Sequence, residues 1–356
     1  MKRILLSGYF GFNNLGDEAI LGSMVNLIEE IDQDTDIIVL SNAPETTKVK
    51  YNTESVYRYD IFNIMSEMRR SDILISGGGS LLQDVTSLRS VPYYLGLIFL
   101  AIIFDMKTIF FAQGVGPVQN KFYRFLIKKI LNKVDYLSVR DKESKKLLEK
   151  IGIPKGKINI VDDPVFGLIN CEPGINRKNN RPQKIGVSVR NWHNNSYLGP
   201  LSEFLNRLGM NNNISITIIP FHQGEDIKIS KKLQGMLKVN SRVSKYTDDL
   251  KKLNELYDNL DLFIGVRLHS LIFSAVNCIP FIGISYDPKT DSLIEEMGYQ
   301  KEIRTEDISV EKIEKTYRKI CDNRNEIKEK IRSTVKRKNK NVRDSLAQLL
   351  STLKGE

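Results

Sequence analysis

The feature that most constrains the fold is a repeated unit, in which a short apolar run leads into a stretch with helical periodicity. In the first half of the chain these runs stand at residues 3–7, 36–40, 72–76, 107–112, 136–140 and 159–161. Their continuous β-branched composition is typical of strands covered on both faces, and alternation with helices predicts a parallel sheet. We therefore expect an α/β, Rossmann-like domain over residues 1–170.

The same unit returns after a polar interruption. Residues 171–183 hold two prolines and lack apolar periodicity, which predicts an interdomain linker. Further strands are expected at residues 184–189, 214–220, 261–265 and 280–285, giving a second Rossmann-like domain over residues 184–306. Residues 307–356 are predicted to form charged C-terminal helices. We expect the two parallel sheets to face each other across a cleft, with ligands bound at the carboxyl ends of the strands.

The charge of the chain is uneven. The net charge is +10, while residues 121–157 carry +8 and residues 301–356 carry +6. Such faces are either solvated helix surfaces or contacts for phosphates, an anionic membrane surface or nucleic acid. We expect no nucleic acid, because aromatic residues are not interleaved there as base stacking requires.

The compartment is predicted from the cysteines and the apolar segments. Cys171, Cys278 and Cys321 are few, odd in number and far apart, so they offer neither a disulfide framework nor a CxxC metal pair, which fits a reducing compartment such as the cytoplasm. The N-terminal apolar run is too short for a signal peptide. Residues 91–104 are too few to span a membrane, so they predict a buried helix or, alternatively, shallow contact with a membrane surface.

Two loops and one strand end in the first domain can carry chemistry. Asp17 lies where a Gly- and Asn-rich loop leads into a helix, so it is either a cap or a carboxylate able to accept a proton. The loop does not have GxGxxG spacing, which disfavours a nicotinamide dehydrogenase. Gly78, Gly79 and Ser80 follow a strand and form either a packing turn or a backbone anion site at a helix N-terminus. Arg140 ends another strand, and either pairs with Asp141 or faces the cleft.

The second domain carries the strongest signal. Arg267 and His269 follow a strand, and in an extended segment they would face the same side. Arg grips carboxylates and phosphates, and His exchanges protons near neutral pH. Lys289 is a candidate second cation or a surface lysine, and His222 either lines the cleft or packs its loop. No cluster has metal-ligand spacing, so we expect no metal and no cofactor.

The order of the loops resembles the polysaccharide pyruvyl transferase family of the CsaB type, over about residues 3–298. The segments that carry the resemblance are GYFGFNNLGDEA, ISGGGSLLQD, FFAQGVGPV, LSVRDKES, VDDPVF, GVSVRNW, PFHQGED, GVRLHSLIFSA and ISYDPKTDSL. The resemblance implies a GT-B-like fold, with phosphoenolpyruvate as donor (a co-substrate) and a sugar, polymeric or lipid-linked, as acceptor. Peripheral contact with the cytoplasmic face of the membrane would suit a lipid-linked acceptor.

Roles follow from this resemblance and from side-chain chemistry. By this resemblance Arg267, Arg140 and Lys289 match the donor-binding positions, with the Gly78, Gly79 and Ser80 amides as support. His269 is expected to be the general acid and Asp17 the general base. Asn14 and His222 are expected to contact the acceptor.

Two other functions compete. A nucleotide-sugar glycosyltransferase has the same fold, but its pair of glutamates eight residues apart is matched beyond the linker only by Glu306 and Glu314, in the charged tail. A non-catalytic module that binds anionic lipid through the basic helices is the second alternative.

Overall fold

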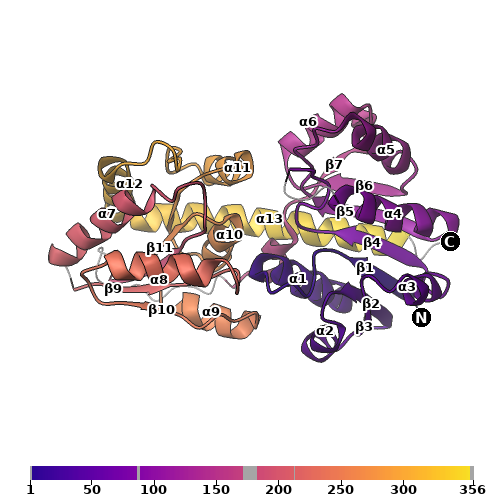
Figure 1. Ribbon diagram of the computed structural model, residues 1–356, viewed down its shortest axis with the longest axis horizontal. Coiled ribbons are helices and arrows are strands. Elements are labelled where there is room, and N and C mark those ends of the chain that lie inside the picture. Colours follow the sequence, from indigo (N-terminus) through magenta and orange to yellow (C-terminus); the bar gives the residue numbers. More distant parts are fainter. Residues whose placement is uncertain (1, 86–88, 171–182, 212, 353–356) are drawn as a thin grey trace. The chain divides into compact units, whose positions relative to one another are not determined.

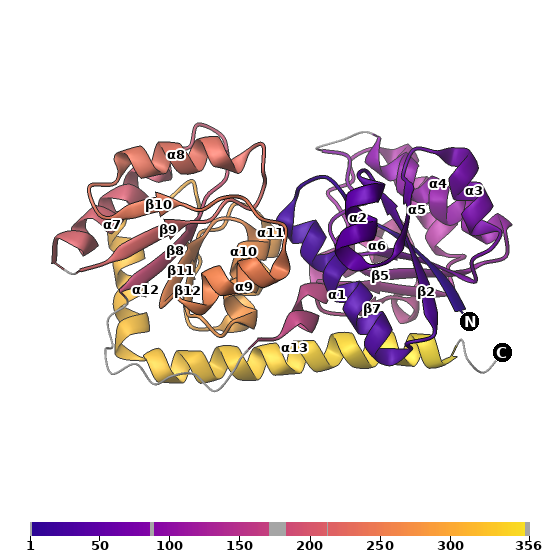
Figure 2. The ribbon, with the colours of Figure 1, turned by 90° about the horizontal axis from the view of Figure 1, so that it is seen from below.

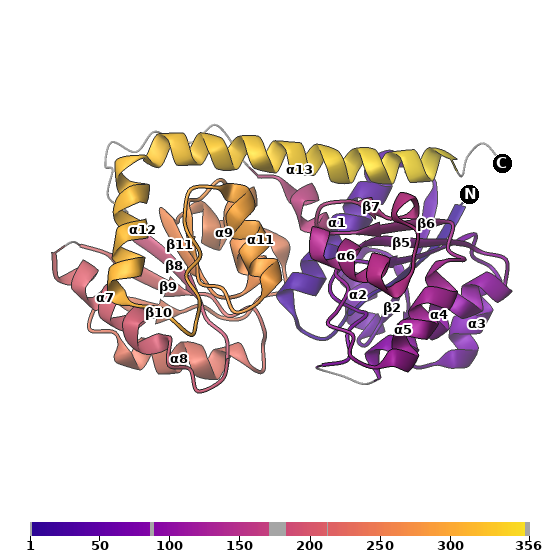
Figure 3. The same ribbon diagram turned by 90° about the horizontal axis from the view of Figure 1, so that it is seen from above.

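Residues 2–85, 89–170, 183–211 and 213–352 are described by the computed structural model. The chain divides into two units, which Figures 1, 2 and 3 show from three directions. Unit 1 comprises residues 1–167 together with 339–356, and unit 2 comprises residues 168–338. The linker predicted at 171–183 lies outside the described residues except for Gln183.

Unit 1 contains a seven-stranded sheet and the helices that cover it. Its strands are β1 (Lys2–Ser7), β2 (Thr35–Ser41), β3 (Glu54–Tyr57), β4 (Ile73–Gly77), β5 (Lys107–Gln113), β6 (Tyr136–Val139) and β7 (Asn159–Ile160). Its helices are α1 (Leu15–Ile31), α2 (Pro44–Tyr51), α3 (Ile61–Met68), α4 (Ser90–Ile103), α5 (Lys121–Leu131) and α6 (Lys142–Ile151), and 3-10 turns lie at Lys155–Lys157 and Pro164–Leu168.

The sheet of unit 1 is parallel throughout, in the order β3-β2-β1-β4-β5-β6-β7. Consecutive residues Ile4, Leu5 and Leu6 of β1 are all buried, so both faces of the strand are covered as the apolar runs predict. One face packs on helices α3 to α6 in a single apolar core. The strand order reverses between β1 and β4, which is where open α/β sheets bind ligands at the carboxyl ends of their strands.

Unit 2 repeats this plan with fewer strands. Its strands are β8 (Lys184–Ser188), β9 (Ser215–Ile218), β10 (Ser241–Val243), β11 (Leu262–Gly265) and β12 (Phe281–Gly283). Its helices are α7 (Leu198–Asn211), α8 (Asp226–Met236), α9 (Leu250–Asp258), α10 (Leu268–Val276), α11 (Pro288–Met297) and α12 (Val310–Asp322). The sheet is parallel in the order β10-β9-β8-β11-β12, so its switch point lies between β8 and β11.

The long helix α13 (Arg324–Thr352), yellow in Figure 2, has contacts in each unit. In unit 2, Arg324 donates to Asp261. In unit 1, Asn339 donates to the carbonyl of Phe166, and Arg343 pairs with Glu30 of α1. The boundary between units therefore falls inside this helix, whereas the predicted boundaries set residues 307–356 apart from both domains.

The cysteines differ from the expectation. Cys278 is disulfide-bonded and Cys321 carries a free thiol. The spacing of the cysteines in the sequence did not indicate this disulfide. None of the helices in the described part of the chain combines enough length and apolar character to cross a membrane.

Candidate active site

The loop after β1 ends at the first turn of α1. Asn14 caps this helix, because its side-chain oxygen accepts a hydrogen bond from the Gly16 N–H at 3.2 Å. Asp17 and Glu18 follow in the first turn, where the helix dipole favours carboxylates. Glu18 is used within unit 1, since it accepts from the Gly11 N–H at 2.8 Å and from the Tyr51 hydroxyl at 3.0 Å.

The glycine turn after β4 packs closely on α1. Gly78 and Gly79 have φ angles of +71° and +68°, a left-handed conformation that favours glycine. A Cβ at Gly79 would lie 2.8 Å from Asp17 Oδ1, so the turn and the carboxylate are neighbours. The Gly78 N–H already donates to the Phe111 carbonyl at 3.1 Å. The next helix, α4, begins only at Ser90, so the glycine turn does not open a helix as expected.

Arg140 is held by carboxylates at the end of β6. Its side chain is almost fully buried and donates to Asp163 Oδ2 at 2.9 Å and to the Ser80 hydroxyl at 3.1 Å. Asp141 lies 3.7 Å from the guanidinium Nε. Arg140 thus pairs with Asp141, which is one of the two alternatives expected from the sequence. Its contact with Asp163 is shorter. Arg140 orients the Ser80 hydroxyl at the glycine turn.

A second buried arginine of unit 1 was not identified from the sequence. Arg58 donates to the Gly8 carbonyl at 2.9 Å and to the Tyr94 hydroxyl at 3.2 Å, and so fixes the start of the first loop. Its guanidinium lies 4.4 Å from the centroid of the Tyr93 ring and 5.0 Å from that of Phe12. Burial raises the pKa of Tyr93 to about 12, although the Arg58 charge acts in the opposite direction.

Arg267 in unit 2 stands at the end of β11 against a buried acid. Its Nη2 donates to Asp226 Oδ1 at 2.6 Å and to Glu225 Oε2 at 3.3 Å. Burial alone would lower the pKa of Arg267, but Asp226, Tyr286 and Glu225 together outweigh it and the pKa is raised. The buried Nε of Arg267 has no hydrogen-bond partner in the described structure. This nitrogen can donate to an anionic ligand.

His269 lies in a helix rather than in an extended segment. Helix α10 begins at Leu268, directly after Arg267, which is its N-cap residue. The argument that Arg267 and His269 face the same side because the segment is extended is therefore wrong, since residues i and i+2 of a helix point apart. Both remain at the amino end of α10, beside the switch point of unit 2.

His222 and Lys289 follow the two flanking strands. His222 comes after β9, and its Nδ1 accepts from the N–H groups of Gly224 at 3.2 Å and Glu225 at 3.3 Å. That bonding leaves Nε2 as the nitrogen that carries the proton in the neutral ring. Lys289 lies in the first turn of α11, three residues after Tyr286, and is half-buried.

Arg190 joins this group and was also not identified from the sequence. It follows β8, and its Nη1 donates to the Tyr286 hydroxyl at 2.5 Å. The Tyr197 hydroxyl accepts from the Arg190 N–H at 3.1 Å and donates to its carbonyl at 2.6 Å, which fixes the backbone. The Nε of Arg190 is buried without a hydrogen-bond partner in the described structure, as it is in Arg267. Arg190 and Arg267 thus follow the two strands that flank the switch point of unit 2.

The charges of both arginines act on the hydroxyl of Tyr286. Burial raises its pKa, and the charges of Arg190 and Arg267 each act to lower it. The Trp192 ring stands 4.7 Å from the Tyr286 ring, and the Arg190 guanidinium lies 5.3 Å from the Trp192 ring. We call Arg190, Arg267, Tyr286 and Trp192 the arginine-pair cluster.

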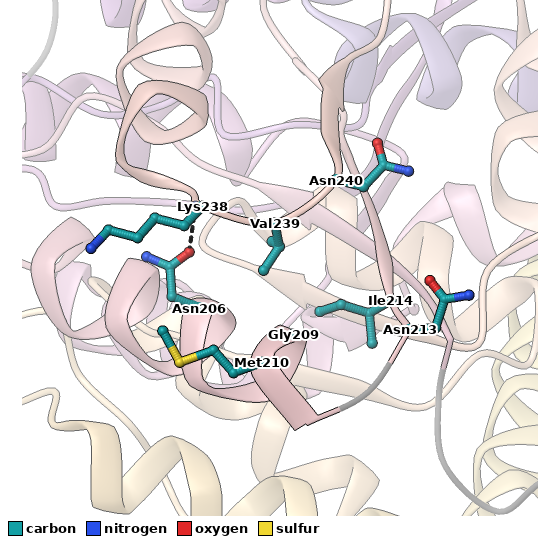
Figure 4. Close-up of a pocket in the computed structure, with 8 residues that line it drawn as sticks. All are labelled: Asn206, Gly209, Met210, Asn213, Ile214, Lys238, Val239 and Asn240. Carbon is teal, nitrogen blue, oxygen red and sulfur yellow. Dashed lines mark hydrogen bonds between the residues drawn. The ribbon is translucent and has the colours of Figure 1, made fainter.

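Two pockets of unit 2 lie elsewhere. One of about 540 Å³, drawn in Figure 4, lies at the amino-terminal edge of the sheet, before β9 and β10. Its Asn206 side chain already accepts from the Lys238 N–H at 2.7 Å. Another, of about 470 Å³, lies between α7 and α12. Neither contains a predicted site residue. Within the described ranges, no group of three or more His, Cys, Asp or Glu side chains is placed to hold a metal ion.

Solved structures share this fold at low sequence identity. A glycosyltransferase from Rickettsia africae matches with a TM-score of 0.66 and 17% identity, over 100% of this chain and 99% of its own. UDP-GlcNAc 2-epimerase from Neisseria meningitidis, bound to UDP-GlcNAc, matches with a TM-score of 0.63 and 11% identity, over 99% and 100%. MurG from Acinetobacter baumannii matches with a TM-score of 0.54 and 10% identity, over 99% and 100%. The prediction of two parallel-sheet, Rossmann-like regions of GT-B type is confirmed.

Sequence comparison identifies the family. No curated protein matches the chain significantly. The family described as polysaccharide pyruvyl transferase matches over residues 14–288, most of the chain. That range includes the loops after β4, β6, β8 and β11. This chain therefore belongs to the polysaccharide pyruvyl transferase family.

Proposed function

We propose that the chain transfers the pyruvyl group of phosphoenolpyruvate to a sugar of a cell-surface polysaccharide or lipid-linked cell-wall precursor, forming a ketal and releasing phosphate. The observation that carries the proposal is the arginine-pair cluster, at the strand ends where an α/β sheet binds ligands. Two guanidinium groups with one buried, unpartnered Nε each suit a small, multiply charged anion. Family membership supports the same reaction class.

The donor carries a carboxylate and a phosphate. We assign both anionic groups to Arg190 and Arg267, with Lys289 as a further cation from the loop after β12. In unit 1, Arg140, Gly78, Gly79 and Ser80 are the proposed contribution to donor binding, with the Arg140 guanidinium orienting the Ser80 hydroxyl. Asn14 and the Nε2 of His222 are the proposed acceptor contacts. We propose no metal and no resident cofactor.

The proposed reaction needs one acid and one base. His269 gives a proton to the methylene carbon of the donor, which becomes a methyl group, and the adjacent carbon becomes cationic. A sugar hydroxyl, deprotonated by Asp17, attacks that carbon and forms the first C–O bond. The second hydroxyl then displaces phosphate, which takes the remaining proton, and the cyclic ketal closes. Fixed cations that meet the charge of the departing phosphate stabilise this step electrostatically.

Binding to the arginine-pair cluster can be measured without knowing the acceptor. Trp192 is the only tryptophan in the sequence and is part of that cluster. Titration with phosphoenolpyruvate should therefore change its fluorescence, whereas Arg190→Gln should abolish saturation at the same concentrations. Arg207→Gln is the matched control, because Arg207 is exposed on α7 and pairs with Glu203 one turn away. No response to phosphoenolpyruvate would refute the proposal.

The alternative is a nucleotide-sugar glycosyltransferase. It is favoured by one observation, that a protein of the same fold is bound to UDP-GlcNAc. Incubation of the enzyme and a cell-wall extract with radiolabelled phosphoenolpyruvate or with a labelled nucleotide sugar separates the two. We expect label from phosphoenolpyruvate in polymer or lipid, with one phosphate released for each pyruvyl group incorporated. Label only from the nucleotide sugar would establish the alternative.

We also propose that the protein acts in the cytoplasm, in peripheral contact with the membrane where a lipid-linked acceptor would be presented. Fractionation of cells by sedimentation checks this location. Recovery of the protein only in the extracellular fraction would contradict it.

A further inference from the structure

Two helices of unit 1 expose large apolar side chains on the same face. On α5, Phe122 and Phe125 are 61% and 53% exposed, and on α4, Phe99 and Ile103 are also exposed. Both helices cover the same face of the sheet and pack into one core through their inner sides. Their outer sides therefore point away from that sheet in the same direction, and Figure 3 shows α4 and α5 side by side. We call these four exposed side chains the apolar strip.

The same face is strongly basic. Helix α5 and its flanks expose five cations, and residues 118–134 contain no Asp or Glu. The five are Lys121, Arg124, Lys128, Lys129 and Lys133. The Lys129 ammonium lies 5.7 Å from the Phe125 ring centroid. The next acid, Asp135, is turned toward β5, where it accepts from the Thr108 N–H and hydroxyl.

Exposed cations and two exposed phenylalanine rings, Phe122 and Phe125, thus occur together on α5. The expectation that aromatic residues are not interleaved with the basic ones is wrong for α5. In its sequence Phe122, Tyr123 and Phe125 are interleaved with Lys121 and Arg124. At the far end of α4, the Arg69 guanidinium lies 5.2 Å from the Phe104 ring. Arg69 therefore adds one cation at the C-terminal end of α4, where Asp105 is also exposed.

We propose that this face of α4 and α5 docks on an anionic lipid surface. Phenylalanine rings are at low free energy at the boundary between headgroups and acyl chains, and lysine side chains extend from that depth to the lipid phosphates. An aliphatic residue, Ile103, belongs to the strip, and aliphatic side chains suit hydrocarbon but cannot stack on nucleic-acid bases. The inference makes the proposed membrane contact specific to one surface, and it does not rest on the identity of the donor.

Vesicle flotation tests the docking surface. The protein should float with vesicles of phosphatidylcholine and phosphatidylglycerol at low salt, and remain unbound with phosphatidylcholine alone. Lys128→Gln/Lys129→Gln should weaken binding about thirty-fold, because each lysine near an anionic surface contributes roughly five-fold. Phe122→Ser/Phe125→Ser should weaken it at least about ten-fold. High salt should weaken the wild type more than the lysine variant.

Matched controls come from unit 2. Lys231→Gln/Lys232→Gln removes two exposed lysines from α8, and Met210→Ser removes an exposed apolar side chain from α7, so both should bind vesicles as the wild type does. All variants should keep the wild-type melting temperature and the wild-type fluorescence response to phosphoenolpyruvate. Undiminished vesicle binding by the two α5 variants, or binding to single-stranded RNA but not to vesicles, would overturn the inference. If only the fluorescence response to phosphoenolpyruvate failed, the proposed reaction would be contradicted but the proposed docking surface would not.

Discussion

Replacing Arg267 by alanine should destabilise unit 2 as well as affect ligand binding. The reason is Asp226, which is 0% exposed and accepts from Arg267 at 2.6 Å and from the Phe221 N–H at 3.0 Å. Arg267→Ala leaves that carboxylate buried with one remaining donor. Removing one partner of a buried ion pair costs about 3–5 kcal/mol, a large part of the 5–15 kcal/mol by which a typical domain is stable.

Urea unfolding monitored by Trp192 fluorescence measures this loss, because the only tryptophan lies in unit 2. With a slope near 2 kcal/mol per molar urea, the midpoint should fall by roughly 1.5–2.5 M. Arg207→Ala is the control, since its exposed ion pair with Glu203 contributes about 0.5 kcal/mol or less.

A double variant separates the charge effect from lost packing. In Asp226→Asn/Arg267→Met, the asparagine oxygen still accepts from Phe221 and no buried charge remains. Its unfolding free energy should return to within about 2 kcal/mol of the wild type. The reasoning is refuted if Arg267→Ala and Arg207→Ala have the same urea midpoint. It is also refuted if the double variant Asp226→Asn/Arg267→Met is no more stable than Arg267→Ala.

Three further outcomes are expected. His269→Ala should lower kcat at least about 100-fold in the phosphate-release assay; activity within a few-fold of wild type would remove His269 as the acid. Arg190→Lys should raise the KM for phosphoenolpyruvate at least about ten-fold with an unchanged urea midpoint, because lysine loses the planar fork; an unchanged KM would exclude Arg190 from the donor site. Burial raises the pKa of Tyr93 to about 12, above its ordinary value near 10. The neutral hydroxyl therefore stabilises the fold below pH 10, and this stabilisation is lost between about pH 10 and 12. Tyr93→Phe should lose the hydrogen bond to the Arg58 carbonyl, which is worth about 1 kcal/mol at pH 7. Above pH 10 the unfolding free energy of this variant should fall less steeply with pH than that of the wild type. Equal slopes for the two proteins, measured by circular dichroism, would contradict this.

The sheets could be predicted because their central strands are covered on both faces. β1, β4 and β5 have continuous apolar runs that few other structures produce. The edge strands β3 and β10 were missed, since ESVY and SRV are short and half-exposed and carry polar residues. Edge strands need no second apolar face, so their sequences resemble those of loops.

The candidate site was predictable in position and less so in geometry. Strand ends identified Arg267 and His269, but nothing in the local pattern showed that α10 begins at once after Arg267. The pairing of Arg267 with Asp226 joins residues 41 positions apart, so only the folded chain reveals it. Arg58 follows β3, a strand that was not predicted. The sequence could have identified Arg190 as a site residue, because Ser188-Val189-Arg190 repeats the tripeptide Ser138-Val139-Arg140 at the end of another strand.

The division of α13 between the units has a consequence for synthesis on the ribosome. Val342, Leu346 and Leu350 are buried, and the helix segment that holds them belongs to unit 1, whose other residues end at Gly167. At about 5–20 residues per second, roughly 10–40 s separate the translation of these two parts. During that interval unit 2 can be completed while an apolar surface of unit 1 stays uncovered, and this nascent chain is the form in which we expect chaperones to bind.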